Sequence, residues 1–489
     1  MINIAQNLIQ GRLQYLAINQ SLLLSARFPL FPLLLVGLFK VFGVDIGVLR
    51  GLSAGLGILS VALLYWVIRR TQGVKAIPLA LVSALLLAIY PQAVLFNRLG
   101  FSYNLLAPLV LLCLWGMWEY LDHPKAGWLA LPVLSIGLGA TSDLAAFTLL
   151  PVLILVISVR RWKDLLWSIP LTGLPMVVYS GWMLLIAPQA FLFDLHYLAS
   201  RLGEIPLVAQ IPAVFLNYSA MTAWDAWVFL AVIGFFLLKP ERFKRITLLL
   251  YFFPLILLGR TVALTGTAYY YIIPLFPLTA LGAGALVCYS IPVILKVIRD
   301  GLSAVFNHWG WSSDRQLLPR LRQVLSVFGA SLAVFLLVVG PLLWIAWTSI
   351  GQVSKAFQTP IDWALVDSGG ARQVADYLNK MTSQDDLIVA SPAIAWLFKA
   401  HVADFQMAIA VKGQSTIHFP TNVPLDRFAY DPDYQKARFV VVDRIWRNWA
   451  SPKMPGVQAM LTDVESWPLE MKKAEYAVYR NPTFPDSMK

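Results

Sequence analysis

Long apolar runs, separated by short polar connections, repeat along the chain up to about residue 350. Most of these runs approach the roughly 20 residues that a helix needs to cross the hydrocarbon core of a bilayer. The pattern predicts about ten spans, at residues 47–69, 75–97, 102–121, 126–142, 144–160, 165–187, 222–238, 246–260, 269–295 and 323–347. We therefore expect an α-helical polytopic membrane protein.

The stretch before the first predicted span is apolar but too short to cross a membrane. Residues 28–42 carry one charge, Lys40, and are interrupted by Pro29 and Pro32. A segment of this kind is typical of a helix that lies at the membrane surface. We expect residues 1–46 to form interfacial helices outside the cytoplasm.

The connections between spans alternate in charge, and this alternation predicts their orientation. Every second connection carries a cluster of Lys and Arg or a single Lys, at residues 69–75, 125, 160–163, 239–245 and 296–322. By the positive-inside rule these connections are cytoplasmic. The intervening connections carry one Arg or none and face outward. Residues 47–347 then form a transmembrane domain, in the inner membrane if the cell is bacterial.

After residue 347 the composition changes to that of a soluble domain. Hydrophobic and charged residues mix, and the pattern predicts helices at 371–381, 393–401 and 457–465 and strands at 387–390, 439–443 and 474–479. Alternating helices and strands indicate an α/β sandwich. Because its last preceding span ends outward, we expect the domain at residues 348–489 to be extracytoplasmic.

Composition excludes several classes of function. Hydrophobic residues make up 58% of the chain and charged residues 13%, which excludes a soluble protein with a single core. The formal charge of +12 does not indicate nucleic acid, because the basic residues lie in short clusters between apolar runs. The five histidines are too scattered for a metal cluster. The glycines of GLSAGLG and LGAGA favour helix packing over a nucleotide loop.

Three arginines in the outward connections are candidates for binding an anion. Arg98, Arg201 and Arg260 are each the basic residue of their connection. A guanidinium presents a fork that matches phosphate oxygens. The alternative is that each one reaches to the interface or pairs with a carboxylate such as Asp194.

Two further outward features have a structural and a functional reading. The run Tyr269–Tyr271 favours an interfacial aromatic belt, with sugar stacking as the alternative. Asp143 lies between two apolar runs, where a cap of a turn is favoured over catalysis. No charged residue lies in the middle of a predicted span and no internal repeat is visible, which disfavours a transporter.

The order of these segments resembles the GT-C superfamily of glycosyltransferases, near the protein O-mannosyltransferases and lipid A aminoarabinose transferases. The resemblance is carried by FPLFPLL before an arginine-opened span, RLGFSYN at the start of the third span, LLPVL followed by RRWKDLL, and YYYIIPLFPLTAL after an outward arginine. It covers about the first 350 residues, and the soluble tail resembles the extracytoplasmic domains of bacterial members.

The resemblance implies transfer of a sugar from a polyprenyl-phosphate donor, on the outer face of the membrane, to a glycan, lipid or protein acceptor. A base would activate the acceptor and cations would hold the departing phosphate. We expect Arg201 and Arg260 to bind the donor phosphate, because each is the sole basic residue of its outward connection. Candidate donor or acceptor contacts are Arg27, Arg98, Tyr103, Asn104, Tyr269 and Tyr270. No cofactor is required, although a divalent metal remains open.

The chain departs from the family pattern at its beginning. In the family one more span precedes an outward loop that opens with the acid proposed as catalytic base, and before Trp118 this chain has one carboxylate, Asp45. We expect the missing span and acid to lie upstream of Met1, and the catalytic residue is unknown. The alternative function is a catalytically inactive relative that serves as a structural or lipid-binding subunit of an envelope complex.

Overall fold

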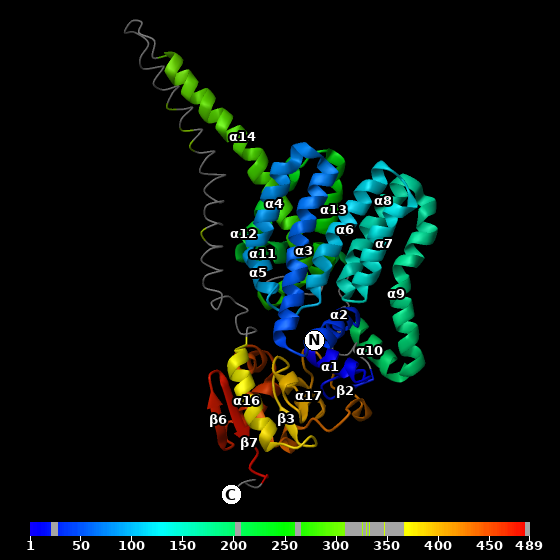
Figure 1. Cartoon of the computed structure of the whole chain (residues 1–489), viewed down its shortest axis with the longest axis vertical. Helices are drawn as coiled ribbons and strands as arrows, with labels where there is room; N and C mark the ends of the chain where they lie inside the picture. Colours follow the sequence, from blue (N-terminus) through cyan, green and yellow to red (C-terminus); the bar gives the residue numbers. More distant parts are fainter. Residues whose placement is uncertain are drawn as a thin grey trace.

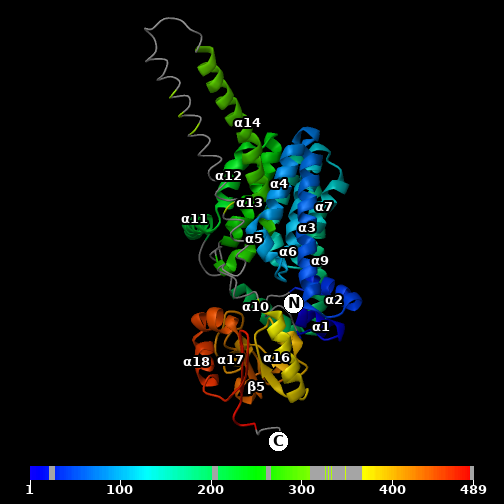
Figure 2. The same cartoon turned by 60° about the vertical axis from the view of Figure 1, so that its left-hand side comes forward.

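A computed structural model of the chain describes residues 1–20, 28–200, 207–259, 266–308 and 366–484, with single positions between residues 308 and 366. It shows a bundle of helices with an α/β domain at one end (Figure 1). The short N-terminal elements lie at the junction of the two parts (Figures 1 and 2).

The bundle is built from helices that mostly follow the predicted apolar runs, except that α11 (Leu207–Trp224) lies largely before the run predicted at 222–238. They are α3 (Ile46–Gln72), α4 (Ile77–Ile89), α5 (Pro91–Phe96), α6 (Tyr103–Asp122), α7 (Ala126–Ala140), α8 (Leu150–Arg161), α9 (Leu165–Ile186), α11 (Leu207–Trp224), α12 (Ala226–Leu237), α13 (Glu241–Gly259) and α14 (Phe276–His308). Two 3₁₀ segments, η2 (Leu144–Leu149) and η4 (Gly266–Leu275), precede α8 and α14. The predicted span at 323–347 lies outside the continuously described residues.

Local sequence signals begin and end the first long helix. The Asp45 carboxylate accepts a hydrogen bond from the Gly47 N–H at 2.6 Å and so caps the start of α3. Arg69 and Arg70 occupy its last turn, where cations favour the helix dipole, and Gly73 ends it with a φ of +78°. The connections α3–α4, α6–α7, α8–α9 and α12–α13 all lie at the end of the bundle away from the α/β domain (Figure 1), in agreement with the predicted alternation of charge.

The number of spans stays a prediction. Over the described residues, four helical stretches are long and apolar enough to cross a membrane: Ile46–Gln72, Tyr103–Asp122, Leu144–Ile186 and Ala268–Ser290. A fifth would form if the two parts of α11–α12, bent by 108°, count as one span. The structure thus confirms a mostly helical protein with several apolar helices and a C-terminal sheet domain.

Small residues bring α12 and α14 into close contact, as predicted for the LGAGA stretch. A Cβ atom added at Gly234 would lie 1.7 Å from the carbonyl oxygen of Gly282, and one at Gly282 would lie 2.3 Å from that of Ala231. On the other side, a Cβ at Gly284 would lie 2.2 Å from the hydroxyl of Ser83 in α4. Close backbone approach of this kind is how helices associate where water provides no driving force.

The α/β domain contains a mixed five-stranded sheet of order β4-β3-β5-β7-β6. Its strands are β3 (Leu387–Val389), β4 (His401–Ala403), β5 (Phe439–Val442), β6 (Leu469–Lys473) and β7 (Tyr476–Arg480), and its helices include α16 (Ser368–Met381), α17 (Phe405–Ala410) and α18 (Pro455–Val464). β3 pairs in parallel with β4 and β5, whereas β7 is antiparallel to β5 and β6.

One predicted helix of this domain is wrong. Residues 393–401 form a short 3₁₀ turn, η6 (Ala395–Leu397), and then enter β4 at His401. The apolar spacing favoured a helix, but the pairing of His401 with Leu387 and of Val402 with Ile388 adds a strand to the sheet. Tertiary pairing of this kind overrides local helix propensity.

The N-terminal residues join the α/β domain to the bundle. Helix α1 (Ile2–Ile9) and the hairpin β1 (Gln14–Tyr15) and β2 (Ile18–Asn19) precede α2 (Leu30–Phe42), the helix predicted at the membrane surface. Hairpin residues, among them Tyr15 and Ile18, belong to the hydrophobic core of the α/β domain. The N–H of Ala429 also donates to the carbonyl of Ala17 at 2.8 Å.

A buried ion pair lies at this junction. The Arg427 guanidinium donates to both carboxylate oxygens of Asp194, at 2.7 and 3.1 Å, and these side chains are 3% and 0% exposed. Asp194 belongs to α10 (Pro188–Ser200), and Arg427 also donates to the carbonyls of Ala190 and Asn19 at 3.3 Å. One side chain of the α/β domain therefore holds both α10 and the hairpin.

Candidate functional site

An aromatic cluster lies where α6 and η4 begin, at the end of the bundle that faces the α/β domain. We define the aromatic cluster as Phe101, Tyr103, Tyr270 and Tyr271. The rings of Phe101 and Tyr270 are nearly parallel with centroids 5.1 Å apart, and Tyr103 lies 5.3 Å from Tyr270 and 5.4 Å from Tyr271. Two stretches that are distant in the sequence, both singled out above, thus meet at one place.

The carboxylate of Asp143 adjoins this cluster. It is half-buried in the turn between α7 and η2, where Oδ1 accepts a hydrogen bond from the Ala145 N–H at 3.0 Å. The cap predicted for Asp143 is therefore confirmed. The hydroxyl of Tyr103 lies close enough to Asp143 for the two groups to interact electrostatically. The arrangement places a carboxylate, which can accept a proton, beside tyrosine rings.

Two of the remaining predicted contacts, Arg98 and Asn104, lie at the connection between α5 and α6. Arg98 is exposed after α5, and among the described residues no hydrogen bond or ion pair of its guanidinium is found. Asn104 is buried, and its amide donates to the carbonyls of Phe96 and Leu99 at 3.2 and 2.9 Å, so it ties the connection between α5 and α6.

The other candidates are three arginines that the structure does not describe and Tyr269, which it does. Arg27, Arg201 and Arg260 lie outside the described residues, so their phosphate and donor contacts stay predictions. Tyr269 is fully buried, and its hydroxyl donates to the Asp225 carboxylate. The sequence had not singled out Asp225 or Tyr90, which bonds to the same carboxylate.

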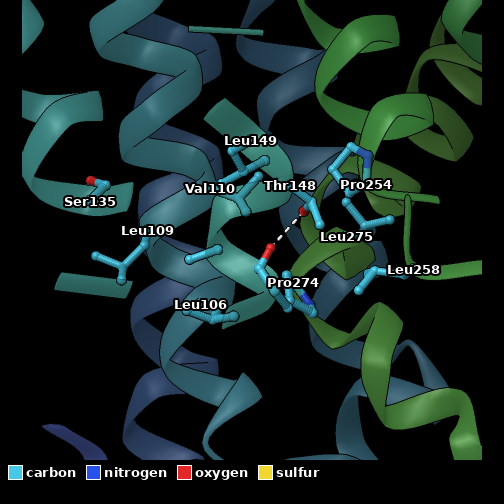
Figure 3. A pocket seen from close by; sticks show the side chains of 12 residues that line it. Leu106, Leu109, Val110, Ser135, Thr148, Leu149, Pro254, Leu258, Pro274 and Leu275 are labelled. Atoms are coloured by element: carbon cyan, nitrogen blue, oxygen red, sulfur yellow. Dashed lines mark hydrogen bonds between the residues drawn. The ribbon is translucent and has the colours of Figure 1, made fainter. Parts of the chain in front are cut away.

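An apolar pocket opens between the same elements that carry the cluster and Asp143 (Figure 3). Its enclosed cavity is small, about 10 Å³, and the roughly 340 Å³ of empty space around it includes space open to the surroundings. It is lined by Leu106, Leu109, Val110, Ser135, Ala145, Ala146, Thr148, Leu149, Pro254, Leu258, Pro274 and Leu275. The Thr148 hydroxyl is satisfied within the wall, because it donates to the carbonyl of Ala145 at 2.6 Å. The lining therefore suits an apolar chain.

Within the described parts of the chain, no group of three or more His, Cys, Asp or Glu side chains lies close enough to hold a metal ion. Asp45 is engaged elsewhere, since it caps α3 and pairs with Arg372 of the α/β domain.

Part of the chain matches a known protein family, and its fold is similar to solved structures. Residues 26–179 match the family described as dolichyl-phosphate-mannose-protein mannosyltransferase. No curated protein sequence matches significantly. A structure of ArnT from Cupriavidus metallidurans bound to undecaprenyl phosphate is similar, with a TM-score of 0.59 and 15% identity, covering 98% of this chain and 92% of that one. The same protein in the apo state gives a TM-score of 0.56 at 16% identity, with the same coverage.

A more distant likeness extends to an oligosaccharyltransferase. The enzyme of Archaeoglobus fulgidus, in complex with Zn and sulfate, gives a TM-score of 0.50 at 13% identity, covering 93% of this chain and 65% of that one. At such identities the likeness concerns the fold. Together with the matched N-terminal segment, it confirms the predicted resemblance to the GT-C superfamily.

Proposed function

We propose that this chain, which has the fold of the GT-C glycosyltransferases, is a membrane protein that transfers a sugar from a polyprenyl-phosphate donor. The transfer takes place at the end of the bundle that faces the α/β domain. One observation carries the proposal. The Asp143 carboxylate and the aromatic cluster lie on the same elements as an apolar pocket. A lipid-linked sugar needs these two environments side by side, one polar and one apolar.

Each part of the site has a role in this proposal. The apolar pocket takes the first units of the polyprenyl chain, and tyrosine rings of the aromatic cluster stack on the sugar. Arg98, Arg201 and Arg260 supply cations for the phosphate, since guanidinium matches its oxygens. The ArnT structure bound to undecaprenyl phosphate supports a lipid of this class.

The proposed transfer is a substitution at the anomeric carbon of the sugar. The acceptor hydroxyl gives its proton to a carboxylate while its oxygen forms a bond to the anomeric carbon of the sugar. The bond from that carbon to the phosphate oxygen breaks, and the polyprenyl phosphate leaves with the electron pair, stabilised by the arginines. Among the described residues, Asp143 is the carboxylate that adjoins the aromatic cluster.

A lipid-binding subunit without transfer activity is the second candidate. It is favoured by the structural role that Asp143 already has, because its carboxylate caps the Ala145 N–H. Both functions need the apolar pocket, but only the first needs the carboxylate as a base.

The test is a pair of measurements on the full chain in lipid nanodiscs: binding of undecaprenyl phosphate, and transfer from polyprenyl-phosphate sugars. Asp143→Asn should abolish most transfer, by about 100-fold or more for a lost base, while binding stays within a fewfold of wild type. Asp164→Asn is the matched control, because Asp164 accepts from Tyr120 at 2.7 Å at the opposite end of the bundle. Binding without transfer in the wild type would favour the lipid-binding subunit, and no binding would refute both.

A further inference from the structure

A buried carboxylate, distinct from Asp143, lies at a sharp bend between two helices of the bundle. Asp225 separates α11 from α12, where the helical parts are bent by 108°, and it is 5% exposed. A carboxylate inside an apolar bundle is expensive and usually has a reason. Capping explains part of it, since Oδ1 accepts from the Trp227 N–H at 3.0 Å.

The other carboxylate oxygen binds two tyrosines from separate elements. Oδ2 of Asp225 accepts hydrogen bonds from the hydroxyls of Tyr90 and Tyr269, which lie 3.4 Å from each other. Both tyrosines are fully buried, and their rings contact Phe276 with centroids 5.0 and 6.0 Å away. The Tyr90 ring also stacks on Trp227 at 4.9 Å. One carboxylate thus joins the start of α12, the α4–α5 junction and η4.

Tyr90 and Tyr269 each begin a stretch that leads to the aromatic cluster. We call these two stretches, residues 90–101 and 269–271, the two arms of the cluster. Tyr269 precedes Tyr270 and Tyr271 in η4, and in a 3₁₀ helix consecutive side chains point about 120° apart. Holding Tyr269 inward therefore sets the direction of its two neighbours. Tyr90 begins the connection that leads to Phe101, and along it Phe96 contacts Phe101 at 5.9 Å and Tyr269 at 6.3 Å.

We propose that Asp225 is a positioning residue. Through its hydrogen bonds with Tyr90 and Tyr269, it holds the two arms of the aromatic cluster against each other. The role for a lipid-linked donor rests on the function proposed above. The requirement for a carboxylate is chemical: one of its oxygens accepts both hydroxyls while the other caps α12. An amide offers a single acceptor oxygen for these three donors, so Asp225→Asn should hold the two arms together only in part.

The first measurement reports on the cluster without any ligand. Phe101→Cys and Tyr270→Cys, in a background without Cys113 and Cys288, place one thiol on each arm, and a short bifunctional thiol reagent joins them. Loss of two hydrogen bonds to a charged group in Asp225→Ala should slow this crosslinking by about tenfold or more. Asp225→Asn should fall between Asp225→Ala and wild type.

Tyr120→Phe is the matched control, because Tyr120 is a buried tyrosine that donates to a carboxylate, Asp164, at the far end of the bundle. Its crosslinking rate should equal that of the parent. The second measurement is the affinity of the same Asp225 variants, with native Phe101 and Tyr270, for undecaprenyl phosphate, which should weaken by about tenfold in Asp225→Ala.

The outcomes separate the two proposals. Crosslinking that is as fast in Asp225→Ala as in Tyr120→Phe would overturn the positioning role. Slower crosslinking in Asp225→Ala, together with no lipid binding by the wild type, would support the positioning role and refute the proposed function. Equal slowing in Asp225→Ala and Tyr120→Phe would indicate a general loss of folding and would also overturn the positioning role.

Discussion

Replacement of Arg427 by Ala should release the junction between the α/β domain and the bundle. The guanidinium makes two short hydrogen bonds to Asp194 and two longer ones to backbone carbonyls, and it is almost fully buried. The variant leaves the Asp194 carboxylate buried without its main counter-charge. A lone buried charge is far less stable than a paired one.

The size of the effect follows from burial. Removing one partner of a buried ion pair costs about 3 to 5 kcal/mol. An exposed pair contributes about 0 to 1 kcal/mol, and Arg447 with Glu465 is such a pair in the same domain, at 3.0 Å with side chains 41% and 43% exposed. Arg447→Ala is therefore the control for Arg427→Ala. Asp194→Leu with Arg427→Met, which removes both charges, should restore most of the loss.

Hydrogen exchange on the full chain in nanodiscs measures this opening. The Ala429 amide donates to the carbonyl of Ala17 across the junction, so its exchange rate reports whether the hairpin and the domain stay together. Arg427→Ala should raise that rate by about 100-fold or more, since each 1.4 kcal/mol is tenfold. Equal rates in Arg427→Ala and Arg447→Ala would refute the reasoning, because burial would then have no bearing on the pair.

Three further predictions concern the phosphate, pH and topology. Arg201→Ala or Arg260→Ala should weaken binding of undecaprenyl phosphate by about tenfold, with partial rescue by Lys, and unchanged affinity in both would leave them as interfacial anchors. Burial raises the pKa of the Asp443 carboxyl from 3.8 to about 6, so the folded chain holds a proton that the unfolded chain releases, and the thermal midpoint of the α/β domain should fall as pH rises from 4 to 7. Asp443→Asn should flatten this dependence, and an unchanged slope would contradict the assignment. Ser383→Cys should react in intact cells with a membrane-impermeant thiol reagent and Ser312→Cys should not, in a background without native cysteines; the reverse result would invert the orientation.

Short-range pattern was enough for most of the bundle helices, because crossing a bilayer demands long apolar runs whatever their neighbours are. Helix α11 (Leu207–Trp224) was not among the predicted runs. The limits of α3 and α6 lie within a few residues of the predicted spans, and the signals are local: a cap at Asp45 and basic residues at the far end. The change to a soluble domain was equally visible. The glycine stretch near Gly282 was predicted as a packing surface, since small residues allow close backbone approach anywhere.

Only the tertiary structure decided which side chains contact one another, because a hydrophobic pattern indicates whether a residue is buried and not which residues it contacts. Tyr103 and Tyr270 were both candidates, yet nothing in their local sequence indicated that their rings meet beside Asp143. Asp194 was a candidate partner for an outward arginine, and it pairs with Arg427 of another domain. The strand at His401 exists because β3 pairs with it. The apolar runs therefore determined which segments become helices, while the packing of those helices determined which polar groups share a site.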